Sequence, residues 1–260
     1  MRRVLSYLSL AVVVSATTLI LLQSGLFDWN SWKPATCVPS GCFCEMASAS
    51  SGIRQKANTW SSLAFIFSSF LILALDRNSR VNRNAISRAN VVMLSMATLL
   101  IGLGSAFFHA SLSLTGQFFD VFGMYLLASF ILSYALSRLC GWQNSTAASL
   151  YVGLNVVLVL LLLFLPEVRR YLFAFILLAG IVTEVVARRS KKLLISKTWW
   201  NTAFLIFSVG YVIWVLDNFR IVCNPSSWLQ GHAIWHILGA ISIVFLFMYF
   251  AGERRVSRSH

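Results

Sequence analysis

Charged residues are scarce in this chain. They make up 11% of its 260 residues, whereas 58% are hydrophobic and the mean hydropathy is +0.76. This composition excludes an ordinary soluble domain, in which about a quarter of the residues are charged. The long hydrophobic runs show no alternation of polar and apolar residues, which excludes a membrane β-barrel. No segment repeats convincingly, and no low-complexity linker divides the chain.

What the sequence does contain is a series of apolar stretches, each long enough to cross roughly 30 Å of hydrocarbon as a helix. They lie near residues 4–23, 57–75, 89–109, 117–137, 147–165, 170–187, 198–216 and 231–250. The sequence therefore predicts one all-α integral membrane domain with short connections.

The formal net charge is +13, with 21 lysines and arginines against eight acidic residues. Suppose that every stretch spans and that the N-terminus is cytoplasmic. Most basic residues then fall in the inner connections, among them Arg188, Arg189, Lys191 and Lys192. This distribution follows the positive-inside rule. The basic residues therefore orient the chain in a lipid bilayer, and nucleic acid is excluded as a partner.

The first stretch, residues 1–24, is either an uncleaved signal anchor or a signal peptide. Retention is favoured because the run is long and no clear small-x-small cleavage site precedes Ser24. Both termini are then cytoplasmic. In either case we expect residues 25–56 to form an outer loop and residues 251–260 to form a cytoplasmic basic tail.

Histidine is rare, and its placement is not random. Apart from the terminal His260, the chain has only His109, His232 and His236, each at the edge of an apolar run. His232 and His236 are four apart and share a helix face, roughly 6 Å apart. The topology places all three near the outer surface. Three histidine ligands that leave the fourth coordination position open are typical of catalytic zinc. The alternatives are a haem site and isolated interfacial histidines.

Two further polar residues accompany the histidines. Ser105 precedes His109 by four residues and shares its helix face, and Asp120 follows across a short connection. Gly102 and Gly104 allow a neighbouring helix to approach closely. An ionisable residue in a membrane segment indicates function by default. The alternative is that Asp120 caps the N-terminus of its helix.

Four cysteines face the outer side of the predicted topology: Cys37, Cys42 and Cys44 in the first outer loop and Cys223 in the last. Cys140 lies alone near the cytoplasmic side. Four thiols in an oxidising compartment indicate two disulfides, with three possible pairings. A cysteine-rich metal knuckle is the alternative.

These motifs together resemble a known family. The Gly-Ser-x-x-x-His motif, an aspartate eleven residues later and a final His-x-x-x-His are similar to the alkaline ceramidase superfamily. That superfamily also includes progestin/adiponectin-type receptors and GPI-remodelling Per1-like proteins. Cys44-Glu45, the run Asn58-Thr59-Trp-Ser61 and Trp214-x-x-Asp217 resemble the alkaline ceramidase branch. The resemblance covers about residues 42–250. It implies a seven-transmembrane-helix bundle over residues 57–250, to which the N-terminal hydrophobic helix is an addition.

By this resemblance, His109, His232 and His236 would hold Zn²⁺, Asp120 would orient and deprotonate the attacking water, and Ser105 would stabilise the oxyanion. These roles agree with general zinc hydrolase chemistry. The implied reaction is hydrolysis of a ceramide-like N-acyl sphingolipid to a fatty acid and a sphingoid base. A lipid ester or GPI-remodelling hydrolase and a zinc-containing seven-helix receptor remain the alternatives. A transporter is disfavoured because no inverted repeat is present.

The resemblance also raises the question of calcium, which many alkaline ceramidases bind near the Cys-Glu motif. Here only Glu45 and Gln55 offer suitable oxygens, and Arg54 and Lys56 repel cations. Calcium needs six to eight oxygens. We therefore expect no calcium site.

Among the possible disulfides, we expect Cys44–Cys223, which would tie the first outer loop to the loop before His232, and Cys37–Cys42, which would close a short loop. Asn58 and Asp217 are interpreted as polar contacts within the bundle, with substrate contact as the alternative. Glu184 is expected to reach the cytoplasmic surface or to pair with Arg188.

Overall fold

The computed structural model describes residues 2–48, 52–78, 86–190 and 197–252. These residues form eight long helices: α1 (Arg2–Gln23), α2 (Lys56–Asn78), α3 (Arg88–Ser111), α4 (Leu114–Cys140), α5 (Asn144–Phe164), α6 (Arg169–Ser190), α7 (Lys197–Asn218) and α8 (Gly231–Ala251). Short 3₁₀ helices occupy Trp29–Ser31, Val38–Ser40 and Pro166–Val168. Each long helix is long and apolar enough to cross a membrane. The predicted all-α, multi-pass membrane fold is confirmed. Most of the expected basic tail, residues 251–260, lies outside the described residues.

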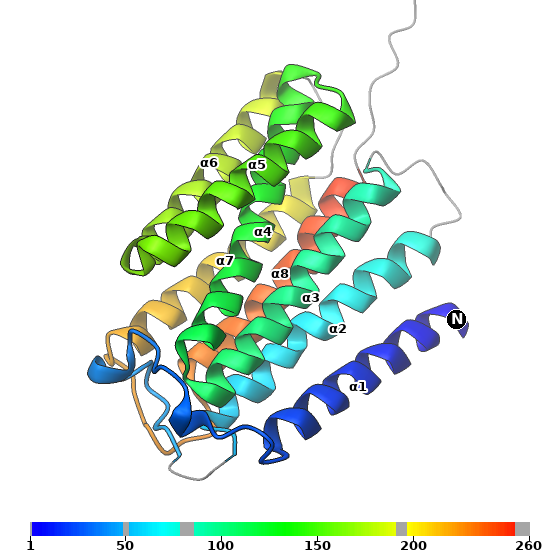
Figure 1. Cartoon of the computed structure of the whole chain (residues 1–260). Coiled ribbons are helices and arrows are strands. Elements are labelled where there is room, and N and C mark those ends of the chain that lie inside the picture. Colours follow the sequence, from blue (N-terminus) through cyan, green and yellow to red (C-terminus); the bar gives the residue numbers. More distant parts are fainter. Residues whose placement is uncertain (1, 49–51, 79–85, 191–196, 253–260) are drawn as a thin grey trace, which may run out of the picture.

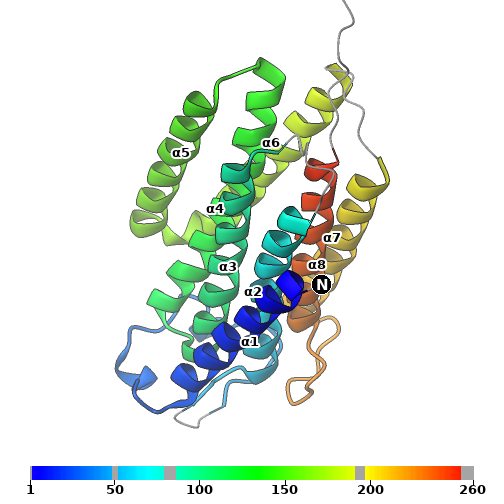
Figure 2. The same ribbon diagram turned by 90° about the vertical axis from the view of Figure 1, so that its right-hand side faces the viewer.

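Four helices form the centre of the bundle (Figures 1 and 2). Helix α3 packs between α2 and α4, and α8 packs between α2 and α7. Helix α4 also contacts α5 and α6, while α1 packs mainly on α2. More than half of the spanning window of α2, α3, α4 and α8 is buried, against at most 22% for the other four helices. The peripheral position of α1 agrees with its interpretation as an addition to a seven-helix core.

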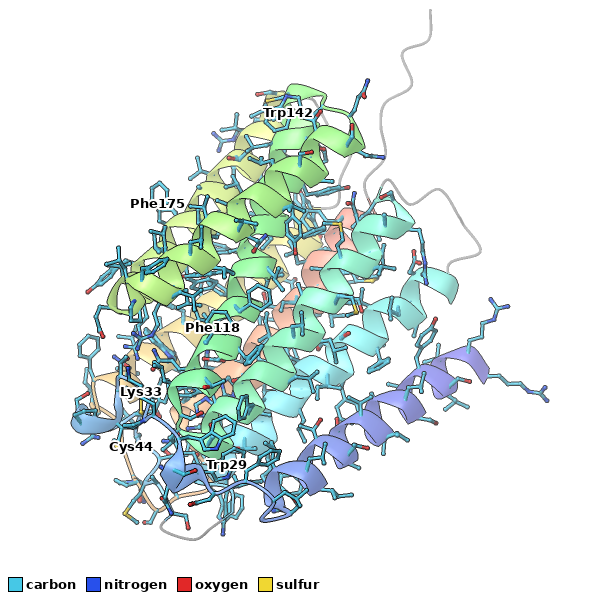
Figure 3. All side chains as sticks on the ribbon, in the orientation of Figure 1. Trp29, Lys33, Cys44, Phe118, Trp142 and Phe175 are labelled. Atoms are coloured by element: carbon cyan, nitrogen blue, oxygen red, sulfur yellow. A yellow bond between two sulfur atoms is a disulfide. The ribbon has the colours of Figure 1, made fainter. Side chains whose placement is uncertain are left out.

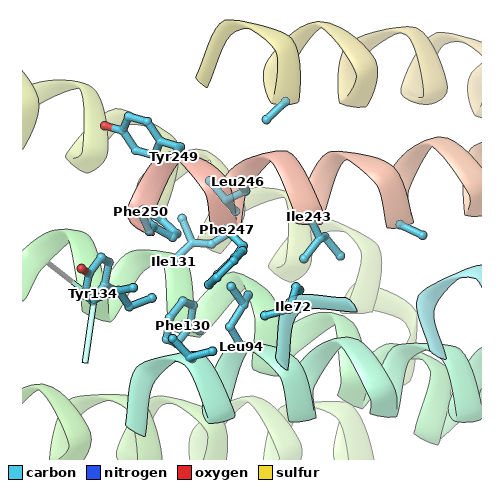
Figure 4. Packing of buried hydrophobic residues seen from close by; sticks show 14 of the residues in the cluster. Ile72, Leu94, Phe130, Ile131, Tyr134, Ile243, Leu246, Phe247, Tyr249 and Phe250 are labelled. Carbon is cyan, nitrogen blue, oxygen red and sulfur yellow. The ribbon is translucent and has the colours of Figure 1, made fainter. Parts of the chain in front are cut away.

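The apolar core lies where α2, α3, α4 and α8 meet (Figure 4). Phe130 and Tyr134 of α4 pack against Phe247 and Phe250 of α8, with Leu94 of α3 beside them. The rings of Tyr134 and Phe250 meet edge to face, with centroids 4.9 Å apart. Burial of these large side chains is what fixes the four central helices relative to one another.

A buried polar network joins three helices near this core. Glu184 of α6 accepts hydrogen bonds from Arg138 of α4 and from the hydroxyl of Tyr249 of α8. The Arg138 guanidinium also lies 4.7 Å from the centroid of the Tyr134 ring. The expectation that Glu184 reaches the surface or pairs with Arg188 is therefore wrong. Packing of α6 directly on α4 makes Arg138 the available partner.

Residues 24–48 and 52–55 cover one end of the bundle, which we call the loop end. Figure 3 shows Trp29, Lys33 and Cys44 there and Trp142 at the opposite end. The segment around Pro34 pairs with the turn between α3 and α4. Ala35 N–H donates to Leu112 O at 2.9 Å, and Leu114 N–H donates to Lys33 O at 2.8 Å.

The turn between α3 and α4 is only two residues long, which decides where Asp120 lies. Leu112 adopts a left-handed conformation (φ 49°), and the Ser113 hydroxyl accepts the Gly116 N–H at 3.0 Å. Ser113 is therefore the N-cap of α4. Asp120 lies in the second turn, so its interpretation as a helix cap is wrong.

Candidate metal centre and active site

Three histidines meet at the loop end of the bundle. His109 belongs to the last turn of α3, and His232 and His236 belong to the first two turns of α8. All three are buried, and one ring nitrogen from each lies within 4.8 Å of the others. The structure therefore brings together the three histidines singled out in the sequence, and this cluster can hold a metal ion.

Backbone contacts hold the ends of these two helices. The last carbonyls of a helix lack partners within it. In α3 they are satisfied by residues before α2: Gln55 N–H donates to His109 O at 3.0 Å, and Arg54 N–H donates to Ala110 O at 3.1 Å. At the start of α8, Asp217 Oδ1 accepts the His232 N–H at 3.1 Å. A Cβ at Gly231 would lie 2.9 Å from Asp217 Cβ, so glycine is what permits this approach.

Gln55 orients the His109 ring. The Gln55 amide nitrogen donates to Cys42 O at 2.6 Å and to Glu45 O at 2.9 Å, which fixes the direction of the amide. The amide oxygen then faces His109 Nδ1 at 2.7 Å. Because that oxygen can only accept, Nδ1 carries the proton and Nε2 keeps a lone pair. Hydrogen bonds of this kind orient metal-binding histidines.

His236 is oriented in the same way by two serines of α2. Its Nδ1 lies 2.9 Å from Ser61 Oγ and 3.3 Å from Ser62 Oγ. Both hydroxyls donate to Asn58 O, at 3.0 and 2.8 Å. Each hydroxyl has one hydrogen, so each oxygen is left to accept from His236 Nδ1–H. The lone pair of His236 is therefore on Nε2.

The third ring completes a donor set that fits a zinc ion. His232 Nε2 lies 3.2 Å from His109 Nε2. His109 and His236 thus direct the lone pairs of their Nε2 atoms into the space between the three rings, and a nitrogen of His232 lies beside them. This arrangement matches the three-histidine set of catalytic zinc sites. Neutral nitrogen donors also suit zinc better than calcium or magnesium.

Ser105 and Asp120 lie beside this cluster. Ser105 Oγ is 3.3 Å from His236 Nε2, and the Asp120 carboxylate lies close enough to interact with the Ser105 side chain. The close crossing of α3 and α4 makes this contact possible. A Cβ at Gly104 would lie 2.4 Å from Phe119 O and 2.9 Å from Asp120 N, which no side chain permits. Asp120 is half-buried, whereas Ser105 is buried.

Two disulfides hold the outer loops, Cys37–Cys42 and Cys44–Cys223, and Cys140 is the free cysteine. The second disulfide joins residues separated by 179 positions. Asp217 reinforces it, because Oδ2 accepts the Cys44 N–H at 3.1 Å while Oδ1 accepts the His232 N–H. Both oxygens of this buried carboxylate are thus engaged in holding the loop against α8.

Glu45, one of the two possible calcium ligands, caps α2. Its Oε1 accepts the Ala57 N–H at 2.7 Å and its Oε2 accepts the Asn58 N–H at 2.9 Å. Burial raises the pKa of the Glu45 carboxyl above its ordinary value, and these hydrogen bonds oppose that shift. Gln55, the other possible ligand, is occupied with His109. Both side chains therefore hold the loop against the histidine cluster.

Most of this chain matches a known protein family. A family model described as Ceramidase matches residues 42–259. The chain belongs to the ceramidase family. It is also 24% identical over 204 residues to the Dictyostelium discoideum protein named "Putative alkaline ceramidase dcd3B", covering 68% of this chain and 69% of that protein. The family resemblance inferred from the sequence motifs is thereby confirmed.

Within this ceramidase-family chain, sequence reasoning missed the residues that orient the histidines. The sequence indicates Gln55 only as a possible calcium ligand and Ser61 only as part of a motif. Asp217 makes structural contacts, as the sequence predicts, but one of its two partners is Cys44 of the outer loop and the other is His232 of α8. The signal for Ser61 was its place in the Asn-Thr-x-Ser run, one helical turn after Asn58. Gln55 gave no comparable signal because it lies in the loop before α2, and only the path of that loop brings it to His109.

Proposed function

We propose that this protein is a zinc-dependent intramembrane amidase that hydrolyses ceramide-like N-acyl sphingolipids to a fatty acid and a sphingoid base. The observation that carries the proposal is the buried cluster of His109, His232 and His236 beside the Ser105–Asp120 pair. Membership of the ceramidase family supports the choice of substrate.

His109, His232 and His236 would hold the metal through their converging nitrogens. When bound there, Zn²⁺ would polarise the amide carbonyl as a Lewis acid and would lower the pKa of a water to about 7. Gln55 and Ser61 keep the Nδ1 protons of two ligands directed away from the metal. These two residues are positioning residues, because they act through the histidines.

Asp120 is the proposed general base. As the water oxygen attacks the amide carbon, the Asp120 carboxylate takes the proton that the water loses. The C–N bond then breaks, and Asp120 returns the proton to the departing amine. Ser105 donates its hydroxyl hydrogen to the oxygen of the tetrahedral intermediate, where negative charge develops. Its place between His236 Nε2 and Asp120 supports this role.

The site is proposed to face the extracytoplasmic side of the membrane. His109 ends one helix and His232 begins another at the same end of the bundle, the end that carries the disulfide-bonded loops. Disulfides persist in oxidising compartments outside the cytosol. An even number of spans then puts both termini on the cytoplasmic side, provided that α1 is retained.

The proposed reaction is tested by analysing products. The purified, zinc-loaded protein is incubated in detergent micelles with a ceramide and, separately, with an ester-linked lipid of the same acyl chain. Mass spectrometry should find equal amounts of fatty acid and sphingoid base from the ceramide. Release from the ester alone would assign the site to a lipid esterase, and release from neither would contradict a hydrolase and favour a receptor.

A further inference from the structure

Phe43 occupies an unusual place in the outer loop. Its ring stacks on His232 with centroids 3.7 Å apart and an interplanar angle of 24°, and it lies 5.4 Å from the His109 ring. Its backbone is left-handed, with φ of 60°. Bulky residues rarely adopt this conformation, because the Cβ meets the backbone. Such a conformation persists only where the surroundings over-determine it.

Disulfides constrain the backbone on both sides of Phe43. Cys42 is bonded to Cys37, and Cys44 is bonded to Cys223. Cys44 N–H also donates to the Asp217 carboxylate, which accepts the His232 N–H with its other oxygen. The backbone of Phe43 is therefore fixed relative to the same turn of α8 that carries His232 (the adjacent Cys44 is labelled in Figure 3).

His232 differs from the other two histidines in what orients it. His109 Nδ1 has Gln55 and His236 Nδ1 has Ser61, but in the described part of the chain no group hydrogen-bonds the buried Nδ1 of His232. A metal-binding histidine almost always has such a partner to fix its ring. In this site the face of the Phe43 ring lies against His232 instead.

We propose that Phe43 is the positioning residue for His232, fixing its imidazole by stacking where the other two ligands are fixed by hydrogen bonds. The two flanking disulfides hold Phe43 in its strained conformation. This inference rests on the zinc centre proposed above. Removing the Phe43 ring should loosen one of three zinc ligands while leaving the helices in place.

The test uses the full-length protein in detergent and measures metal binding directly. Phe43→Gly removes the ring and also suits the left-handed backbone, since glycine has no Cβ. Zinc affinity, measured by competition with a chromophoric chelator, should fall by about 10–100-fold, as for loss of other groups that orient a metal ligand. The visible spectrum of bound Co²⁺, which reports ligand geometry, should change as well. Phe43→Tyr should keep the wild-type zinc affinity and Co²⁺ spectrum, because it keeps the ring.

The matched control is Phe27→Ala, which removes an aromatic ring of the same loop that stacks on Trp29. Its zinc affinity and Co²⁺ spectrum should equal those of wild type. If Phe43→Gly does not form the Cys44–Cys223 disulfide, Phe43→Leu decides, because it keeps the side-chain volume without the aromatic face and is expected to show the same losses.

Failure of the proposed role of Phe43 and failure of the proposed zinc centre give different results. Wild-type zinc affinity and an unchanged Co²⁺ spectrum in the folded Phe43 variants would overturn the role of Phe43 and leave the zinc centre intact. A wild-type protein that binds neither Zn²⁺ nor Co²⁺ would overturn the zinc centre itself, and this inference with it.

Discussion

Asp120 is half-buried in the second turn of α4, where its carboxylate interacts with Ser105 of α3 and with the charges of Arg169 and Arg170 of α6. An aspartate at such a depth needs a reason, because an ionisable side chain in a membrane segment is costly. Its contact with a serine that also approaches His236 supplies one. Neither side chain is a proposed zinc ligand, so each can be altered with all three histidines in place.

Asp120→Asn keeps the shape of the side chain but cannot take a proton. We expect zinc content to stay at the wild-type level while ceramide turnover falls by about 10²–10⁴-fold, the usual contribution of a general base. Turnover is measured as sphingoid base released per zinc-loaded protein. Asp28→Asn, at an exposed aspartate of the outer loop, is the control. Full activity in Asp120→Asn would remove this residue from the mechanism.

Ser105→Ala removes one proposed oxyanion donor. The expected loss in turnover is about 10–10³-fold, within or somewhat below the range for single oxyanion-hole donors. Because the carboxylate and the metal ligands remain, zinc content should not change. The exposed Ser226→Ala serves as control. The proposed role of Ser105 fails if turnover of the alanine variant equals that of wild type.

At the scale of the helices, two glycines permit the close contacts that bring the elements of the site together. Gly104 lets α4 cross α3 against the backbone of Phe119 and Asp120, and Gly231 lets α8 start against Asp217. The network of Glu184, Arg138 and Tyr249 joins α4, α6 and α8 at a distance from the histidine cluster. The helices are thus held together at two places. Close packing at glycines holds them near the histidine cluster, and a buried polar network holds them farther away.

Glu184→Ala tests whether the buried polar network stabilises the helix packing. It removes the carboxylate that accepts a hydrogen bond from the buried Arg138 guanidinium. Breaking a buried ion pair costs about 3–5 kcal/mol in protein interiors. Thermal unfolding in detergent should therefore occur at a clearly lower temperature, whereas zinc affinity of the folded protein should be unchanged. Glu167→Ala, at an acidic side chain 78% exposed, should unfold like wild type. An unchanged unfolding temperature in Glu184→Ala would show that this network does not fasten the helices.

For the molecule as a whole, the sequence predicted the helices well because long apolar runs in a bilayer have few alternatives to a helix. It also predicted the histidine cluster, since three of only four histidines lay at helix ends on one side. It did not predict that Gln55 and Phe43 contact the histidines, because the path of the outer loop brings them there. It misassigned the partner of Glu184, because helix packing, not sequence spacing, chose Arg138 over Arg188.

The proposed orientation in the membrane can be tested with the chain's own thiol. Cys140 is free and exposed at the end of α4 opposite the loops, while the other four cysteines are in disulfides. In intact cells a membrane-impermeant maleimide should not label the protein, and after permeabilisation it should label Cys140. Cys140→Ser is the control for specificity. Labelling of Cys140 from outside intact cells would reverse the proposed orientation.

The central claim is that three histidines hold a zinc ion on which ceramide hydrolysis depends. The most direct measurement determines zinc per chain and sphingoid base released on the same samples: wild type as purified, wild type after chelation and zinc return, and His232→Ala. We predict one zinc per chain and activity in wild type, loss of both on chelation, recovery of both with Zn²⁺, and neither in His232→Ala, since two imidazoles make a poor tetrahedral site. Full hydrolysis by the chelated protein, or zinc in His232→Ala at the wild-type level, would contradict the account.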